Sequence, residues 1–205
     1  MRKLIIAEHI SLDGIIQAPG GPKEDSSGDF RLGGWTVPYA DKAIGQTVQN
    51  LLSEPFDLLL GRRTYDIWAA YWPRVQAGHA IADMFNSVPK HVATHRSDTL
   101  DWQNSHALKG ELADAIRALK RQDGANLLTW VSGDMVRQLL AAGLVDELQL
   151  LIYPVVLGRG KRLFDDNAQA SAFTLANSTN AACGVLITRY VRSGEVRTGS
   201  FEEVE

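Results

Sequence analysis

The chain has 205 residues, of which 45% are hydrophobic and 22% charged, and its formal net charge is −3 at pH 7. This length suits one domain that folds without disulfides or a structural metal, and the net charge argues against a broad electrostatic contact with nucleic acid. The single cysteine, Cys183, excludes an internal disulfide and is typical of a reducing compartment.

The N-terminal apolar run ends at Glu8, which is too short for a signal peptide or a membrane span, so we expect a cytoplasmic protein. Residues 3–8 have no helical period and predict a buried strand. Residues 19–34 follow with clustered Pro, Gly and Ser, and they predict a long loop of the kind that is often functional.

Helices and strands then alternate along the chain. Helices are predicted at residues 41–52, from Gly61 to Trp72, at 109–121 and from Met135 to Gly143, and strands at 56–61, 90–94, 126–131 and 145–156. The last forty residues or so change character: residues 172–179, 184–192 and 196–201 alternate, and they predict antiparallel strands with a hairpin turn near Ser193-Gly194. The sequence therefore predicts one α/β domain over residues 1–205, a parallel-rich sheet between helices with an antiparallel C-terminal edge.

The most informative junction is Gly61-Arg62-Arg63-Thr64, where a predicted strand runs directly into a helix. Unpaired N–H groups at a helix N-terminus suit an anion, and two arginines add full charge and bidentate geometry. A phosphate site is one interpretation. The other is that both arginines are solvated and Thr64 caps the helix.

Two further junctions are weaker candidates. Residues 94–97, Thr94-His95-Arg96-Ser97, follow a strand and could hold a second phosphate, although a polar loop would carry the same residues. Ser132-Gly133-Asp134 again joins a strand to a helix. Ser132 and Gly133 suit a close approach of the backbone to a pyrophosphate, whereas Asp134 would repel one, so an ordinary Ser or Asp helix cap is the alternative.

Other chemistries find little support in the sequence. The five histidines lack metal-ligand spacing, and residues 158–161 lack the third glycine of a dinucleotide-binding loop. Asp41 opens a helix after the long loop, where it could relay a proton, bind heterocycle N–H groups or simply cap the helix. Trp35, Tyr65 and Trp68 could stack on a planar ligand, although Trp68 at helical spacing is more often a core residue.

Several short motifs occur together in a specific order. They are residues 10–16 (ISLDGII), 61–65 (GRRTY), 143–148 (GLVDEL), 154–160 (PVVLGRG) and Leu163-Phe164. In this combination, which spans nearly the whole chain, the sequence resembles the dihydrofolate-reductase-like superfamily. The resemblance is to the branch related to the C-terminal reductase domain of bacterial riboflavin biosynthesis, the bifunctional deaminase-reductase.

The resemblance implies a three-layer α/β/α fold with a mixed sheet, and a homodimer. It also implies an NADPH-dependent reductase that passes hydride to a small heterocycle, similar to 5-amino-6-(5-phosphoribosylamino)uracil reductase or dihydrofolate reductase. By position, it assigns Arg62, Arg63 and Thr64 to the cofactor phosphates, Thr94, His95 and Arg96 to the 2′-phosphate, Ser132, Gly133, Asp134 and Met135 to the pyrophosphate and ribose, and Ala7, Ile15 and Ile16 to the nicotinamide end.

The leading hypothesis is therefore an NADPH-dependent reductase, with Asp41 as the acid and Trp35 and Tyr65 beside the substrate. Hydride transfer needs mainly the positioning of two rings, which fits a sequence with phosphate-type junctions, no metal site and no triad. The alternative is a nucleotide- or pterin-like ligand-binding protein of the same fold without turnover, and a third hypothesis is a structural dimer.

Overall fold

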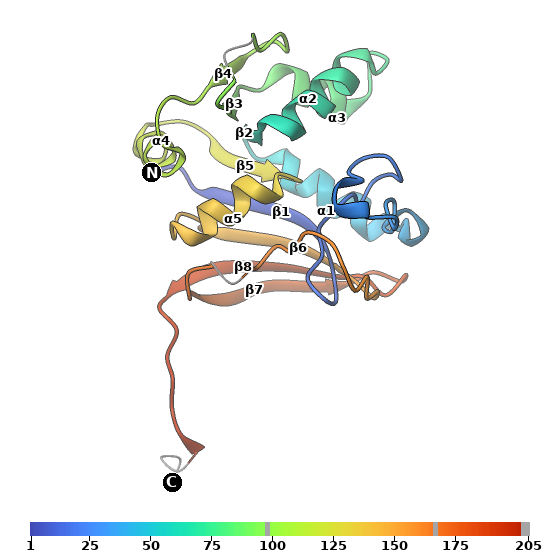
Figure 1. Ribbon diagram of the computed structural model, residues 1–205, viewed down its shortest axis with the longest axis vertical. Coiled ribbons are helices and arrows are strands. Elements are labelled where there is room, and N and C mark those ends of the chain that lie inside the picture. The colour runs from blue at the N-terminus through green and yellow to red at the C-terminus, as the bar shows by residue number, and fades with distance from the viewer. Residues whose placement is uncertain (97–98, 166–167, 202–205) are drawn as a thin grey trace.

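The computed structural model describes residues 1–96, 99–165 and 168–201, and within these residues the strands form one mixed sheet (Figure 1). The sheet has the strand order β4-β3-β2-β5-β1-β6-β8-β7. The strands are β1 Leu4–Ser11, β2 Phe56–Gly61, β3 Lys90–Ala93, β4 Ser105–Ala107, β5 Asn126–Trp130, β6 Glu147–Tyr153, β7 Ala172–Asn180 and β8 Leu186–Gly194.

The sheet is parallel over most of its width. β1 lies at its centre, parallel to β5 on one side and to β6 on the other, and β2, β3 and β4 continue the parallel part. β8 runs antiparallel to both β6 and β7. This confirms the predicted parallel-rich sheet with an antiparallel C-terminal edge.

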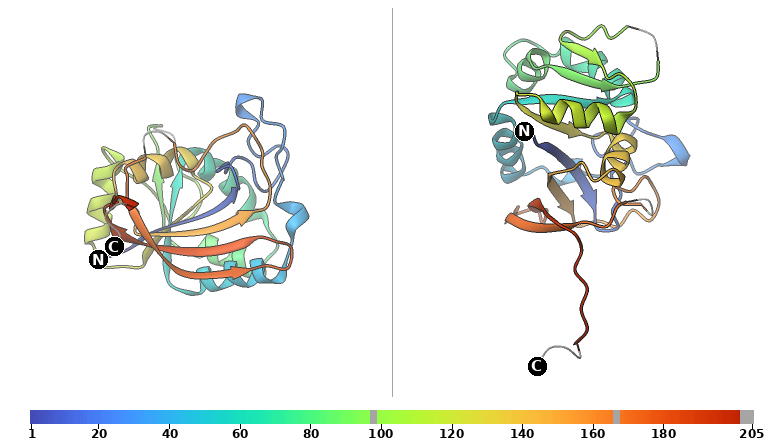
Figure 2. Two further views of the ribbon diagram at one scale, coloured as in Figure 1. Left: turned by 90° about the horizontal axis from the view of Figure 1, so that it is seen from below. Right: turned by 90° about the vertical axis from the view of Figure 1, so that its left-hand side faces the viewer.

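Helices cover both faces of the sheet, which gives three layers (Figures 1 and 2). They are α1 Lys42–Ser53, α2 Arg62–Tyr71, α3 Ala80–Ser87, α4 Leu112–Arg121 and α5 Gly133–Ala141, with short 3-10 turns at Ser27–Asp29, Val37–Tyr39 and Trp72–Arg74. α4 and α5 pack on the face of β1 that carries Leu4 and Ile6, whereas α1, α2 and α3 pack on the face that carries Ala7. None of the helices described here is long and apolar enough to cross a membrane.

A third apolar cluster fixes the long loop that follows β1. Trp35 packs edge-on against Tyr153 with ring centroids 5.3 Å apart, and its indole N–H donates to the Gln17 carbonyl at 2.9 Å. Ile15 and Phe30 are buried in the same cluster. Because its own side chains pack into the core, this loop has a defined place beside the carboxyl end of β1.

The C-terminal hairpin differs from the sequence prediction. β7 and β8 are joined at residues 181–185, where the Ala181 N–H donates to the Val185 carbonyl and Gly184 adopts a φ of +87°. The predicted turn at Ser193-Gly194 is wrong, because Gly194 is the last residue of β8 and pairs with Ala172. Residues 195–200 form no strand and lead away from the body of the molecule (Figures 1 and 2).

Two elements were not predicted, and one predicted strand is shorter than expected. α3 and the three-residue strand β4 fall in segments whose apolar residues have no clear period. The strand expected at residues 145–156 is limited to β6, which ends immediately before Pro154. A proline there removes a ladder donor, so it closes the strand.

Candidate functional site

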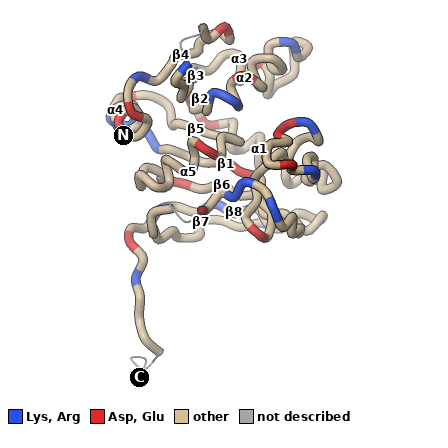
Figure 3. Tube along the Cα trace, viewed as in Figure 1, with Lys and Arg blue, Asp and Glu red and all other residues tan. Residues whose placement is uncertain are grey.

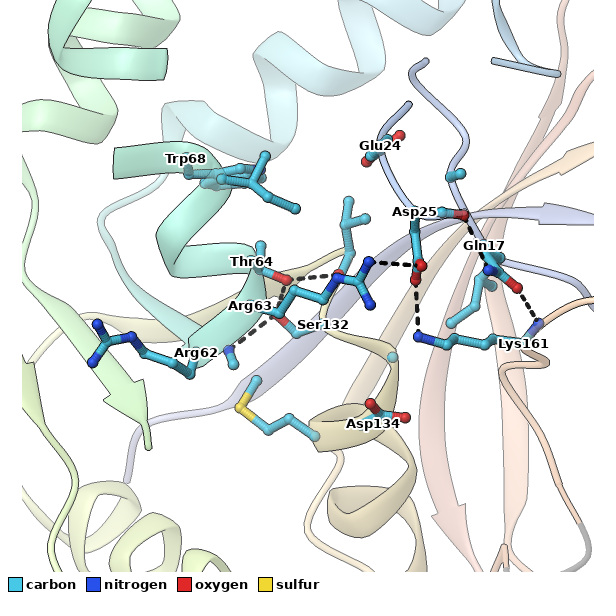
Figure 4. Close-up of a pocket in the computed structure, with 17 residues that line it drawn as sticks. Gln17, Glu24, Asp25, Arg62, Arg63, Thr64, Trp68, Ser132, Asp134 and Lys161 are labelled. Atoms are coloured by element: carbon cyan, nitrogen blue, oxygen red, sulfur yellow. Dashed lines mark hydrogen bonds and ion pairs between the residues drawn. The ribbon is translucent and has the colours of Figure 1, made fainter. Parts of the chain in front are cut away.

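Two strand-to-helix junctions meet at the carboxyl edge of the sheet. β2 runs into α2 and its neighbour β5 into α5, and the first residues of both helices line a cavity of about 150 Å³ (Figure 4). The cavity is lined by Ile16, Gln17, Ala18, Glu24, Asp25, Gly61, Arg62, Arg63, Thr64, Ile67, Trp68, Val131, Ser132, Gly133, Asp134, Met135 and Lys161. The partial positive charge of both helix N-termini therefore acts on whatever occupies it.

A chain of hydrogen bonds holds the two junctions together. The Gly61 N–H donates to the Ser132 Oγ at 3.1 Å, the Ser132 hydroxyl donates to the Thr64 Oγ1 at 3.1 Å, and the Thr64 hydroxyl donates to the Val131 carbonyl at 2.8 Å. Both hydroxyls are buried. Ser132 and Thr64 thus use their side chains to fix the geometry of the cavity.

The turn from β5 into α5 is sharp. Val131 has a φ of +57°, which is rare for a β-branched residue and is often found at ligand sites. A side chain on Gly133 would begin 3.0 Å from the Ile16 Cδ1, so this position is tight for anything larger than glycine. Gly133 therefore allows the helix N-terminus to lie close to the cavity and to Ile16.

The cations of the cavity are held by carboxylates. The Asp25 carboxylate bridges Arg63 and Lys161, at 2.8 Å from each, and so spans the cavity from the long loop (Figure 4). Burial raises the pKa of Asp25, but hydrogen bonds from Lys161 and Ser27 and the charge of Lys161 outweigh it and lower this pKa to about 2. Asp25 is consequently ionised at neutral pH and lies between the two cations, Arg63 and Lys161.

Asp134 lines the cavity, and a cation lies beside its carboxylate. Its carboxylate, 71% exposed, forms an ion pair with Arg137 one turn further along α5. Arg137 also contacts Asp165 at 3.3 Å. The predicted repulsion between Asp134 and a phosphate is therefore reduced by a neighbouring cation.

The structure brings about half of the residues that the sequence singled out together in this cavity. Those that line the cavity are Ile16, Arg62, Arg63, Thr64, Ser132, Gly133, Asp134 and Met135, whereas Ala7, Ile15, Thr94, His95 and Arg96 do not. Ala7 and Ile15 are fully buried. Arg96 reaches α2 through Asp66, at 2.7 Å, and Asp66 also binds Arg62 at 2.8 Å. Ser97 lies outside the described residues.

The predicted substrate and acid residues lie outside this cavity. Asp41 caps α1 and accepts from the Ala43 N–H at 2.7 Å. Tyr65 is buried and its hydroxyl accepts from the Trp102 N–H, and Trp35 holds the long loop. The aromatic side chain that does line the cavity is Trp68, which also stacks on Phe85 with ring centroids 4.9 Å apart.

Sequence reasoning missed the residues that close the cavity from the long loop. Gln17, Glu24, Asp25 and Lys161 all line it. The Gln17 amide oxygen accepts from the Lys161 N–H at 3.0 Å and so connects the loop to the turn after β6. The charged residues of the loop at 19–34 were the available signal, but only the fold shows that they face Arg63.

The motif at residues 10–16 has a structural role, because its Asp13 holds a turn of the chain. The Asp13 carboxylate accepts from the N–H groups of Leu157 and Gly158 at 3.1 and 2.8 Å, and from the Ser11 hydroxyl at 2.6 Å. It therefore holds the glycine-rich turn that precedes Lys161. The two motifs therefore contact each other in the fold.

A second cavity, of about 320 Å³, lies at the opposite edge of the sheet. Its lining includes Lys3, Phe56 and Asn126, at the starts of β1, β2 and β5, and no helix N-terminus. Ligands of open α/β sheets bind at the carboxyl ends of strands, which favours the first cavity as the functional one. Figure 3 shows Lys and Arg interspersed with Asp and Glu over the chain. The described residues contain no cluster of three or more His, Cys, Asp or Glu suited to a metal.

The fold is that of dihydrofolate reductase. The structure of dihydrofolate reductase from Enterococcus faecalis, complexed with NADP(H), superposes with a TM-score of 0.58 at 12% identity and covers 93% of this chain and 96% of that chain. A putative riboflavin biosynthesis protein from Shewanella sp. PV-4 superposes with a TM-score of 0.64 at 20% identity, and covers 93% of this chain and 99% of that chain. The protein is thus an α/β protein of the dihydrofolate-reductase-like class.

Within that class, the chain belongs to the RibD C-terminal domain family, whose model matches residues 2–187. It is 26% identical over 196 residues to the uncharacterized protein YyaP of Bacillus subtilis, an alignment that covers 94% of this chain and 96% of that protein. The resemblance predicted from the motifs is confirmed. Family and fold together point to a reductase-like protein.

Proposed function

We propose that this protein is an NADPH-dependent reductase that transfers hydride to a small heterocyclic substrate. The observation that carries the proposal is the convergence of two helix N-termini, those of α2 and α5, with Arg62, Arg63 and Lys161 around one cavity. Such a set of donors and cations suits a diphosphate. The E. faecalis reductase, which shares the fold, was solved with NADP(H).

The residues present fit the diphosphate end of a dinucleotide. Gly133 would allow backbone N–H groups to approach a phosphate closely, and the position between Arg63 and Lys161, where the Asp25 carboxylate lies, would suit a second anion. A phosphate would take the place of the Asp25 carboxylate. At about 150 Å³ the cavity holds only part of a dinucleotide, so the long loop has to move when the ligand enters.

The bound cofactor would supply hydride, and the protein would position the two rings and exclude water. Arg62, Arg63 and the N-terminus of α2 would bind phosphate, and Thr94, His95 and Arg96 would bind the 2′-phosphate. Ser132, Gly133, Asp134 and Met135 would lie by the pyrophosphate and ribose, and Ile16 would lie at the nicotinamide end together with the buried Ala7 and Ile15. Homodimer formation remains part of the proposal.

The residues proposed to contact the substrate differ from those that the sequence predicted. Trp68 lines the cavity, whereas Tyr65 lies in the core, so Trp68 is the better candidate to stack on a planar ligand. Trp35 would not contact the substrate, and its role would be to hold the long loop in place. Asp41 serves α1 as a cap, which leaves the source of the proton to be found elsewhere.

The test is a titration of NADPH and NADH against intrinsic tryptophan fluorescence, with Trp68 as the reporter in the cavity. We expect saturable quenching, and tighter binding of NADPH than of NADH. No saturable quenching at millimolar cofactor would contradict the proposal. Binding without NADPH oxidation over a panel of pterins, flavin precursors and quinones would favour a ligand-binding protein without turnover.

A further inference from the structure

A histidine and a tyrosine form a hydrogen-bonded pair near the carboxyl ends of the two central strands β1 and β6. The His9 Nδ1 lies 2.8 Å from the Tyr153 Oη, and the two ring centroids are 5.5 Å apart. Tyr153 is 2% exposed, whereas His9 is only partly buried. The buried tyrosine therefore holds one side of an imidazole whose other side is partly open.

This hydrogen bond assigns the proton of the imidazole. Buried hydroxyl groups nearly always donate, and His9 is the one hydrogen-bond partner that the Tyr153 hydroxyl has among the described residues. The hydroxyl therefore donates to Nδ1, and in the neutral ring the proton lies on Nε2. The Nε2 has no partner among the described residues and is not sealed from solvent, so it is a free N–H donor.

Neither member of the pair is charged at neutral pH. Burial lowers the pKa of His9 to about 4, whereas burial, together with the nearby Cys183, raises the pKa of Tyr153 to about 12. The surroundings are aromatic: His9 stacks on Trp130 with ring centroids 5.6 Å apart, and Tyr39 packs edge-on against Tyr153 at 5.7 Å. Such surroundings disfavour an imidazolium, so His9 is a neutral donor.

Trp130 connects the pair with the cavity on one side. It belongs to the apolar cluster against which Trp68 packs, and it directly precedes Val131; both Trp68 and Val131 line the cavity. Its own indole N–H is buried without a hydrogen-bond partner among the described residues. Two unused N–H donors, those of His9 and Trp130, thus lie in stacked rings on the face of the sheet that carries Trp68.

The long loop connects the pair with the cavity on the other side. Tyr153 packs edge-on against Trp35, whose indole N–H donates to the Gln17 carbonyl, and Gln17 lines the cavity. The pair consequently lies between the two segments that border the cavity, the end of β5 and the long loop. A planar ligand that enters from the cavity along this face can reach the open side of His9.

The proposed reduction needs a proton, because reducing a C=N or C=O bond adds one hydride and one proton. Asp25, with a pKa of about 2, has lost its proton at neutral pH, and Asp41 is engaged as the cap of α1. Glu8 is fully buried and faces the opposite side of the sheet from His9, since side chains alternate along a strand. Glu24 lines the cavity and is the carboxyl group to compare with His9 by experiment.

We propose that His9 donates the proton of the reduction from its Nε2–H, and that Tyr153 holds the ring and supplies a proton to Nδ1. This inference rests on the proposed reductase function. His9 is the catalytic residue of the pair because it contacts the substrate. Tyr153 acts through His9 and is a positioning residue.

The proposed step balances as follows for a C=N bond. The substrate carbon accepts a hydride from the bound cofactor, and the electron pair of the double bond forms a new N–H bond as the Nε2–H bond of His9 breaks. The Nδ1 lone pair takes the hydroxyl proton of Tyr153 at the same time, so no imidazolate forms and a tyrosinate remains. After the product leaves, solvent protonates Nε2 and the Nδ1 proton returns to Tyr153.

The first test is ¹⁵N NMR of the histidine-labelled protein without cofactor, in which His9→Gln identifies the His9 signals. We expect a neutral ring at pH 7 with its proton on Nε2. Tyr153→Phe should remove this preference for one tautomer. Tyr190→Phe is the matched control and should leave it unchanged, because Tyr190 packs in the apolar cluster on the other face of the sheet. A proton on Nδ1, or a charged His9 at pH 7, would overturn the proposal.

The second test is the rate of NADPH oxidation with a pterin, flavin precursor or quinone that wild type reduces. His9→Gln keeps a side-chain N–H donor but has no proton to give up, so its kcat should fall about 100-fold while its affinity for NADPH stays unchanged. His106→Gln, at an exposed position, should behave as wild type. Tyr153→Phe should lose rate at pH 7 and regain it as pH falls, because a protonated imidazole donates without the tyrosine.

Three results would contradict the role of the pair. They are a full rate in His9→Gln, a loss of rate in Glu24→Gln without one in His9→Gln, and a loss in Tyr153→Phe that is the same at every pH, as a merely structural tyrosine would give. Absence of NADPH binding by wild type contradicts the proposed function alone. A protein that oxidises NADPH as fast with His9→Gln as without it contradicts the proton donor alone.

Discussion

Replacing Asp25 by asparagine tests whether this carboxylate competes with a ligand for the cavity. Asp25 lies 2.8 Å from both Arg63 and Lys161, whose side chains are 57% and 30% exposed. Partly exposed ion pairs contribute about 0.2–1 kcal/mol each, so the two together contribute about 0.5–2 kcal/mol. A phosphate that binds between Arg63 and Lys161 must break both ion pairs of Asp25. Asp25→Asn should therefore raise affinity for NADPH about 2- to 30-fold.

The assay is the dissociation constant of NADPH, and of inorganic pyrophosphate as a smaller probe, from tryptophan fluorescence at low salt. Asp114→Asn is the matched control, because Asp114 forms an exposed ion pair with Arg117 on α4, which contributes nothing to the cavity lining. The control should bind as wild type does. Weaker binding by Asp25→Asn would refute the reasoning, since it would mean that Asp25 organises the site and does not block it.

Arg96→Ala should weaken NADPH much more than NADH, and Arg117→Ala should affect neither; equal losses for both cofactors would refute the assignment to the 2′-phosphate. Ser132→Ala leaves the part-buried Gly61 N–H without its partner and should lower the free energy of unfolding by about 1–3 kcal/mol in urea. Retention of full stability would show that the two junctions hold without it. Burial lowers the pKa of His9 to about 4, so the unfolded chain binds a proton at higher pH than the folded one, and stability should fall as pH drops from about 6.5 to 4. His9→Gln should flatten that fall, by about 3 kcal/mol at most, and an unchanged pH dependence would contradict it.

Much of the fold could be predicted from the sequence because its elements have a clear period. Strands such as β2, whose bounds match the prediction, carry unbroken apolar runs, and helices such as α1 follow a marked polar cap, Asp41. The hairpin between β7 and β8 was misplaced, because Ser193-Gly194 and the turn around Gly184 both look like turns. Only pairing between strands decides between them.

The candidate site was predictable where charge follows a strand. Arg62, Arg63 and Gly133 lie at junctions that any parallel sheet brings to one edge, and the structure places all three in one cavity. Asp25 and Glu24 were not predicted as site residues, because they reach the cavity only through the way the long loop packs. Tertiary contacts, such as that of Trp35 with Tyr153, determine that placement and leave no local pattern in the sequence.

Glu8 shows a different limit. In the sequence it only ends an apolar run, and nothing there distinguishes a strand-end carboxylate in water from one buried beside a cavity. The register between β1 and β5 places Glu8 next to the end of β5, and its carboxyl group has no side-chain hydrogen bond among the described residues. A polar residue inside a central strand is therefore a useful signal once the strand is known to be central.

The most direct test of the proposed function is equilibrium binding of NADPH to wild type and to the double variant Arg62→Ala/Arg63→Ala. Wild type should give saturable quenching of tryptophan fluorescence, and the double variant, with an unchanged circular dichroism spectrum, should lose at least about tenfold in affinity, given the strength of charge-assisted bonds to phosphate. Equal affinity of the two proteins, or no binding by wild type at millimolar NADPH, would contradict the assignment of this cavity to the cofactor.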